Sequence, residues 1–182
     1  RRQRQMCIRD REYGVIIAPK HLAFNDTEIN RLGVSVFMTE QQARENELRG
    51  TQAAIEDAGA LGVMTAFNRV GITAANAHTG LLKNILRGEW GFRGMVITDG
   101  FHFTDYMDSD IAIRNGCDLM LKNYDVATNH LTDTTSATSV KAMRQACKNI
   151  MYTVVNSRVY DPANTVSTPI WLSLIHISEP TR

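Results

Sequence analysis

Met95-Val96-Ile97-Thr98-Asp99 is the stretch that decides the fold, because an apolar and β-branched run ends there in a carboxylate. A short run of this kind is typical of a strand buried within a sheet. Three further runs have the same character, at residues 15–18, 61–67 and 117–121. We therefore predict four buried strands, the third of which ends at Asp99.

Helical patterns lie between and after these strands. A capping box formed by Thr39 and Gln42 opens a helix that we expect to run to Ala58. Shorter helices are expected over residues 79–87 and 105–114. Apolar residues at helical spacing predict the buried face of a final helix, and they are Val140, Met143, Cys147, Ile150, Met151 and Val154.

The alternation of strands and helices predicts a parallel sheet with right-handed crossovers, and therefore an α/β fold. A complete (β/α)8 barrel of the TIM type needs about 250 residues, so four strand-helix units in about 160 residues correspond to about half of one. The competing architecture is an open doubly wound sheet, which usually has a glycine-rich phosphate turn after its first strand. Here Gly59 and Gly62 precede a strand instead, so the barrel is the favoured prediction.

The composition excludes several classes of protein. The chain has 182 residues, 43% of them hydrophobic, and a formal net charge of +1, so nothing in it requires a nucleic-acid partner. No apolar run is as long as a membrane span. The cysteines, Cys7, Cys117 and Cys147, form no C-x-x-C pair, and the histidines show no H-E-x-x-H spacing. We therefore expect no metal, no other cofactor, no nucleic acid and no membrane partner.

The two ends of the chain are expected to be foreign to the fold. Residues 1–11 carry five arginines before any apolar period begins, and together with residues 172–182 they resemble the two ends of a translated sequencing adapter. Segments of this kind are left out of fold reasoning. We expect a partial barrel domain over residues 12–160 and the start of an interdomain linker over residues 161–171.

Polar side chains stand where three of the predicted strands end. Lys20 and His21 follow the first strand, Asn68 follows the second, and Asp99 closes the third. In a barrel these carboxyl ends meet at one mouth, where catalytic groups lie. Groups of this kind suit a neutral hydroxylated ligand better than a phosphate. From the residues alone, Asp99 could be a nucleophile, a general base, a metal ligand or the N-cap of the next helix.

Four motifs, at residues 20–31, 39–45, 64–68 and 86–99, occur in the order and at the spacing of one known family. They resemble glycoside hydrolase family 3, and most closely its β-glucosidase-like branch. The resemblance implies that the chain is the C-terminal half of the N-terminal barrel of that family. It also implies a retaining, exo-acting β-glycosidase that hydrolyses O-glycosidic bonds through a covalent glycosyl-aspartate intermediate.

The resemblance also assigns roles to individual residues. The nucleophile of the family corresponds to Asp99, and a retaining enzyme pairs it with a protonated carboxyl group about 5 Å away. That acid/base is implied to come from a C-terminal α/β domain of the same parent chain, so the fragment alone is expected to be inactive. The implied substrate is a β-linked oligosaccharide or glycoside. Substrate-binding contacts are implied for Lys20, His21, Arg31, Met64 and Phe67.

Two positions depart from the family pattern. Phe67 stands where a tyrosine is usual, and Gly100 stands where a tryptophan usually forms part of the wall around the leaving group. Both changes remove a group that the β-glucosidase-like branch uses. They keep open a second interpretation, a non-catalytic carbohydrate-binding barrel derived from the same family.

Overall fold

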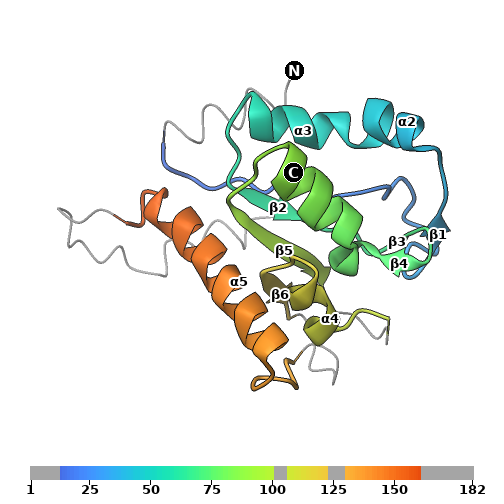
Figure 1. Ribbon diagram of the computed structural model, residues 1–182. Coiled ribbons are helices and arrows are strands. Elements are labelled where there is room, and N and C mark those ends of the chain that lie inside the picture. Colours follow the sequence, from blue (N-terminus) through green and yellow to red (C-terminus); the bar gives the residue numbers. More distant parts are fainter. Residues whose placement is uncertain (1–12, 101–105, 123–129, 161–182) are drawn as a thin grey trace, which may run out of the picture.

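A computed structural model describes residues 13–100, 106–122 and 130–160 of the chain. The adapter-like ends and the expected linker lie outside this part of the chain. Within it, a parallel sheet is flanked by helices, and a smaller sheet stands at the end of the molecule away from the long last helix (Figure 1).

The main sheet has the strand order β2-β5-β6, and all of its strands run parallel. β2 spans Gly62–Met64, β5 spans Met95–Gly100 and β6 spans Leu119–Leu121. These strands coincide with three of the four predicted runs. Helices lie between successive strands of this sheet, and α5 follows the last one. The fold is therefore α/β with parallel strands.

The prediction of a buried strand over residues 15–18 is wrong, because these residues are exposed or half-buried. The parallel pairing with β2 begins within this run, at Ile17, and continues to Leu22. Gly62 N–H donates to the Ile17 carbonyl at 3.1 Å, and Leu22 N–H donates to the last carbonyl of β2 at 2.8 Å. Pro19 lies between these contacts and has no N–H to donate, so the segment is extended but does not form a regular ladder.

The first helical region begins where the sequence predicts. Thr39 is the N-cap, and its hydroxyl accepts the Gln42 N–H at 3.2 Å while the Gln42 side chain accepts the Thr39 N–H at 3.3 Å. The region comprises α2 (Glu40–Gln42), the π-helical turn η1 (Ala43–Glu47) and α3 (Arg49–Glu56). The predicted capping box is thus confirmed.

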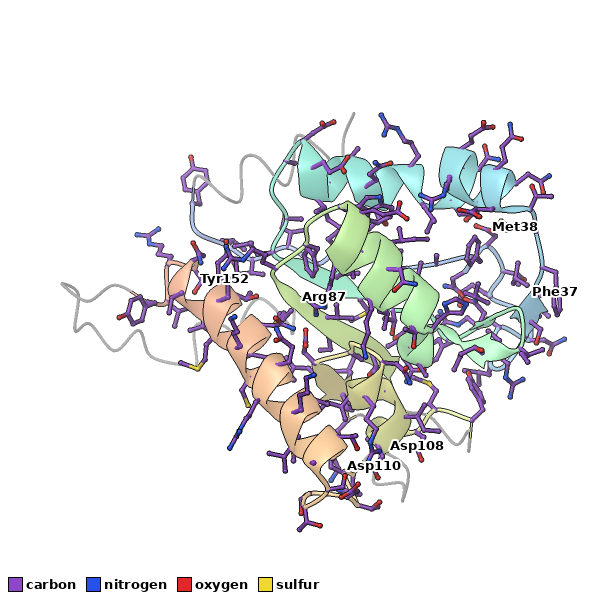
Figure 2. The ribbon with its side chains drawn as sticks, in the orientation of Figure 1. Phe37, Met38, Arg87, Asp108, Asp110 and Tyr152 are labelled. Carbon is purple, nitrogen blue, oxygen red and sulfur yellow. The ribbon has the colours of Figure 1, made fainter. Side chains whose placement is uncertain are left out.

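The later helices are the π-helical η3 (Gly80–Glu89), α4 (Ser109–Arg114) and α5 (Ala137–Val155). α4 starts later than expected because Asp108 is its N-cap and accepts the Ile111 N–H at 2.8 Å. Asp110, on the first turn of α4, accepts a hydrogen bond from the backbone of the segment that leads into α5. Asp108 therefore fixes where α4 begins, and Asp110 links α4 to the segment before α5 (Figure 2).

The buried face of α5 is not the predicted one. Met151 is 65% exposed and Cys147 is also exposed. The helix instead contacts the sheet through small and polar side chains, because Thr153 accepts the Met95 N–H at 2.9 Å and donates to the Leu61 carbonyl at 3.1 Å. The buried residues of α5 are Ser139, Ala146, Asn149 and Thr153.

A second, smaller sheet was not predicted. It has the order β1-β3-β4, with β1 at Ser35–Val36, β3 at Arg69–Val70 and β4 at Thr73–Ala74, and the short helix η2 (Ala75–Ala77) follows. Its strands are too short to show the alternation that reveals a strand in sequence. Gly71 adopts a φ of 61° in the turn between β3 and β4, a conformation that favours glycine.

The main hydrophobic core lies between the parallel sheet and the helices α3 and η3 (Figure 1). Burial of each large aliphatic side chain contributes about 1.5–3 kcal/mol to stability. Fully buried or nearly fully buried members of this core include Leu22, Leu48, Val63, Leu82, Leu86 and Val96.

A buried ion pair ties these layers together at the amino ends of the strands. The Asp118 carboxylate, whose side chain is 2% exposed, lies 2.6 Å from the Arg87 guanidinium of η3. It also accepts the Val96 N–H of β5 at 2.7 Å and the Asn149 amide of α5 at 2.8 Å. Burial raises the pKa of Asp118, and Arg87 and the hydrogen bonds oppose that rise. Arg87 reaches this site from η3, beside the sheet (Figure 2).

Replacing Asp118 with asparagine is expected to lower the free energy of unfolding by about 3–5 kcal/mol, because Arg87 then keeps a buried charge without its partner. The matched control is Glu89→Gln, which breaks the solvent-exposed ion pair with Arg44 and should change stability only slightly. Urea denaturation of the 182-residue chain measures both. Equal losses in the two variants would contradict a central role for Asp118.

Candidate active site

Two predicted site residues meet at the carboxyl ends of the strands. Asp99 lies one residue before the end of β5, and His21 lies in the segment that pairs with β2. His21 Nε2 is 3.0 Å from Asp99 Oδ2, and both side chains are 14% exposed. This is the edge of a parallel sheet at which barrel enzymes carry their chemistry.

The two oxygens of Asp99 have different surroundings. Oδ1 accepts the backbone N–H of Gly100 at 2.8 Å, and Oδ2 is buried and faces His21. Oδ2 has no hydrogen-bond partner in the described part of the chain, so the backbone holds the carboxylate through Oδ1. A carboxylate with such an oxygen can act as a nucleophile or a general base.

The ring of His21 has a polar neighbour at each of its nitrogens. Nδ1 is 3.2 Å from the amide nitrogen of Asn25, on the side opposite Asp99. Burial lowers the pKa of His21, and the charges of Lys20 and Arg31 lower it further, while Asp99 acts in the opposite direction. His21 is therefore a neutral imidazole at pH 7.

Arg31 lies against Phe67. Its guanidinium carbon is 4.6 Å from the centre of the Phe67 ring, a cation–π contact, and its Nε is 3.1 Å from a carboxylate oxygen of Glu28. The Phe67 ring is 1% exposed, and the Tyr106 hydroxyl donates to the Phe67 carbonyl at 2.6 Å. The buried ring thus forms a fixed platform under the Arg31 guanidinium.

The remaining predicted residues border this group. Lys20 is exposed and precedes His21 directly, and the peptide bond between them is cis. Met64 is half-buried at the end of β2, opposite Ile97 of β5. The structure therefore brings His21 and Asp99 into contact, and the charges of Arg31 and Lys20 are close enough to act on His21. Met64 lies at the end of the neighbouring strand β2.

Two residues of this group were missed from the sequence. Asn25 lies four positions after His21, inside a matched motif, and that spacing was a signal that could have identified it. Tyr106 follows a stretch that the structure leaves undescribed, and nothing in its sequence context marks it as a partner of Phe67.

Metal and membrane sites were searched for among the described residues. There, no group of three or more His, Cys, Asp or Glu side chains could hold a metal ion. In the same part of the chain, no helix has the length and apolar character that crossing a bilayer requires.

Comparison with known proteins gives matches over most of the chain. A sequence model of the glycosyl hydrolase family 3 N-terminal domain matches residues 4–160. Probable beta-glucosidase J of Aspergillus fumigatus is 42% identical over 106 residues, which are 58% of this chain and 12% of that protein. Beta-glucosidase B of Emericella nidulans is 42% identical over 86 residues, 47% of this chain and 10% of that protein. The chain thus spans only 10–12% of the length of these curated relatives.

Solved structures share the fold. The beta-glucosidase of Kluyveromyces marxianus superposes with a TM-score of 0.67 and 26% identity, covering 80% of this chain and 18% of that chain. A beta-glucosidase from Paenibacillus barengoltzii gives a TM-score of 0.73 over 91% of this chain and 20% of that chain. The second is 23% identical, and its similarity concerns the fold alone.

The ring of His21 is expected to titrate below the ordinary histidine pKa of 6.5. The unfolded chain then binds more protons as the pH falls through 6.5, so the stability contributed by neutral His21 is present above pH 6.5 and is lost below it. Asp99→Asn should lower the pKa further, because the Asp99 charge raises it, and Glu28→Gln should lower it less. NMR titration of the ring nitrogens measures all three. A midpoint above 6.5 in the parent chain would contradict this assignment.

Proposed function

Because the chain belongs to glycosyl hydrolase family 3, we propose that its parent protein is a retaining, exo-acting β-glycosidase of the β-glucosidase type. The observation that carries the proposal is the 3.0 Å contact between His21 and Asp99 at the carboxyl ends of parallel strands. The β-glucosidase relatives named above support the choice of a β-linked glycoside as substrate.

Asp99 is the proposed nucleophile. Its carboxylate attacks the anomeric carbon and forms a glycosyl ester while the bond to the leaving-group oxygen breaks. Water then attacks the same carbon, cleaves the ester and restores the carboxylate, so the configuration at that carbon is retained. His21 Nε2 lies 3.0 Å from Asp99 Oδ2 without a hydrogen bond between them, so this oxygen stays available for the attack.

The cationic side chains are the proposed sugar contacts. Lys20 is exposed at the site and can donate to sugar hydroxyls through its ammonium group. Arg31 is oriented by Phe67 on one side and by Glu28 on another, so its remaining N–H groups can face a ligand. Met64 contributes an apolar border to the same site.

A retaining mechanism needs a second carboxyl group about 5 Å from the nucleophile. Glu28, an acid close enough to influence His21, is largely exposed and paired with Arg31. We assign the acid/base instead to a C-terminal α/β domain of the parent protein. That assignment agrees with the small share of the relatives that this chain spans.

The proposed scaffold is the C-terminal half of a (β/α)8 barrel. In support, the extended segment at residues 17–22 and the strands β2, β5 and β6 lie side by side in chain order, all parallel. Along β5, Val96 and Thr98 are fully buried, whereas Ile97 and Asp99 on the other face are half-buried. That second face corresponds to the interior of a barrel.

In the full-length parent, Asp99→Asn is expected to lower turnover of an aryl β-glucoside by several orders of magnitude, because the amide cannot form the glycosyl ester. The matched control is Asp108→Asn, since asparagine caps a helix as well as aspartate and should leave turnover unchanged.

Trapping with a 2-deoxy-2-fluoro β-glucoside adds a second measurement. The parent enzyme should gain the mass of one glycosyl group, and Asp99→Asn should not. An unlabelled but sugar-binding parent would instead support the non-catalytic carbohydrate-binding barrel, and near-parental turnover of Asp99→Asn would refute the nucleophile.

The 182-residue chain alone is expected to be inactive and to associate. It lacks the proposed acid/base, and the half-buried strand β6 at Leu119–Leu121 offers a hydrogen-bonding edge to a second copy. Assays with p-nitrophenyl glycosides and size-exclusion chromatography measure the two properties. A stable monomer with measurable turnover would argue against both the missing acid and the half-barrel.

A further inference from the structure

The segment that carries Arg31 has little regular structure of its own. Residues 25–33 form neither a helix nor a strand, and most of their side chains are exposed. Fixing such a segment costs backbone entropy, so an arginine on it keeps one position only if other groups hold the segment. Glu28 pairs with Arg31 but lies on the same segment. The segment therefore needs an anchor elsewhere in the fold.

Arg69 on β3 provides that anchor. Its backbone N–H donates to the Val34 carbonyl at 2.7 Å, and its side chain donates from Nη1 to the Gly33 carbonyl at 2.8 Å. From this point β1 and β3 run on side by side as a parallel pair (Figure 1). Two successive carbonyls just after Arg31 are thus bound to one residue of β3.

Tyr106 holds the side chain of Arg69 in turn. The guanidinium carbon of Arg69 is 4.7 Å from the centre of the Tyr106 ring, a cation–π contact. The ring also lies against the backbone of Gly33, where an added Cβ would be 3.3 Å from a ring carbon. Gly33 has a φ of 78°, a conformation that favours glycine, and the missing side chain permits the close approach.

The hydroxyl of Tyr106 closes a circuit of contacts. It donates to the Phe67 carbonyl at 2.6 Å, and the ring of the same Phe67 lies 4.6 Å from the guanidinium carbon of Arg31. Met107, next to Tyr106, is fully buried against Phe67, so the fold fixes this part of the chain. The contacts therefore start at Arg31 and return, through two aromatic rings and Arg69, to the segment that carries it.

We propose that Tyr106 is a positioning residue that fixes the guanidinium of Arg31, through this circuit, for binding a hydroxyl group of the sugar. The proposal rests on the proposed role of Arg31 as a sugar contact, and Tyr106 itself needs no contact with the ligand. A binding group that is already in place loses less freedom when the ligand arrives. The circuit therefore favours affinity for the sugar and leaves the chemical step at Asp99 unchanged.

The first test follows Arg31 in the 182-residue chain by NMR. Protons above the face of an aromatic ring resonate upfield, so the Nε–H signal of Arg31 reports its contact with the Phe67 ring. Tyr106→Phe removes only the hydroxyl, and we expect it to move this signal towards the position of a free arginine. The matched control is Tyr152→Phe, because the Tyr152 ring lies 4.6 Å from the guanidinium carbon of a different arginine, Arg93. An Arg31 signal that Tyr106→Phe leaves in place overturns the proposal.

The second test measures sugar binding by the full-length parent. The loss of one hydrogen bond corresponds to about 2–12-fold, so Tyr106→Phe should raise the inhibition constant of D-glucose by about that factor. Turnover of an aryl β-glucoside at saturation should be nearly unchanged. Because Tyr106 acts through Arg31, the same substitution should have little effect in an Arg31→Ala background.

An equal loss of affinity in both backgrounds would show a general structural effect and overturn the proposal, as would a loss confined to kcat. An unchanged constant in Arg31→Ala alone would refute the sugar contact instead. The NMR measurement separates that failure from a failure of Tyr106 to position Arg31.

Arg69→Lys breaks the circuit at a second point. Lysine keeps the charge but loses the planar group that stacks on the Tyr106 ring. We expect it to move the Arg31 signal and to weaken glucose binding in the same direction as Tyr106→Phe. A variant that changes neither would contradict the circuit, even if Tyr106→Phe should fail to fold.

Discussion

The Asp118 carboxylate is the constraint on which the rest of the structure depends. It contacts η3 through Arg87, β5 through the Val96 N–H and α5 through Asn149, all at the amino ends of the strands. Taking such a charge out of water is costly, and the cost is offset only when every partner is in place. The network is therefore complete in only one arrangement of η3 and α5 against the sheet, and it destabilises other arrangements. The candidate active site lies at the other end of the same strands, where the carboxylate of Asp99 takes no part in the Asp118 network.

The register set by that network decides which way Asp99 points. Side chains alternate along a strand, so fixing Val96 against the helices turns Ile97 and Asp99 toward the opposite face. His21 reaches the same place through parallel pairing with β2, and Gly62 permits that pairing, since a Cβ there would lie 2.9 Å from the Ile17 carbonyl. The contact between His21 and Asp99 is thus a consequence of sheet geometry, although 78 positions separate the two residues in the chain.

The sequence was sufficient for the elements with a strong local signal. β5 was predicted because it is apolar and ends in an acid, and the first helix was predicted because Thr39 and Gln42 cap it. Patterning failed where polar contacts outweigh hydrophobicity. On α5, Asn149 and Thr153 are buried because they hydrogen-bond to Asp118 and to the backbone at Met95, and no periodicity of apolar residues reveals such partners. The site was predicted as a set of strand ends. The bond between Asn25 and His21 was not, because it depends on a loop conformation that sequence periodicity does not describe.

The distribution of charge around Asp99 explains why a histidine, and not a lysine or arginine, touches it. Arg31 is held by the Phe67 ring and by Glu28, and the exposed Lys20 lies beside His21, so neither cation is recorded in an ion pair with Asp99 among the described residues. A direct cation would neutralise the carboxylate and strengthen its attachment to the protein. A neutral imidazole lies against Oδ2 of Asp99 and leaves the charge of the carboxylate in place. In the proposed reaction a carboxylate oxygen of Asp99 first forms a bond to the anomeric carbon, and that bond later breaks. A carboxylate that the protein holds only weakly can take part in both steps.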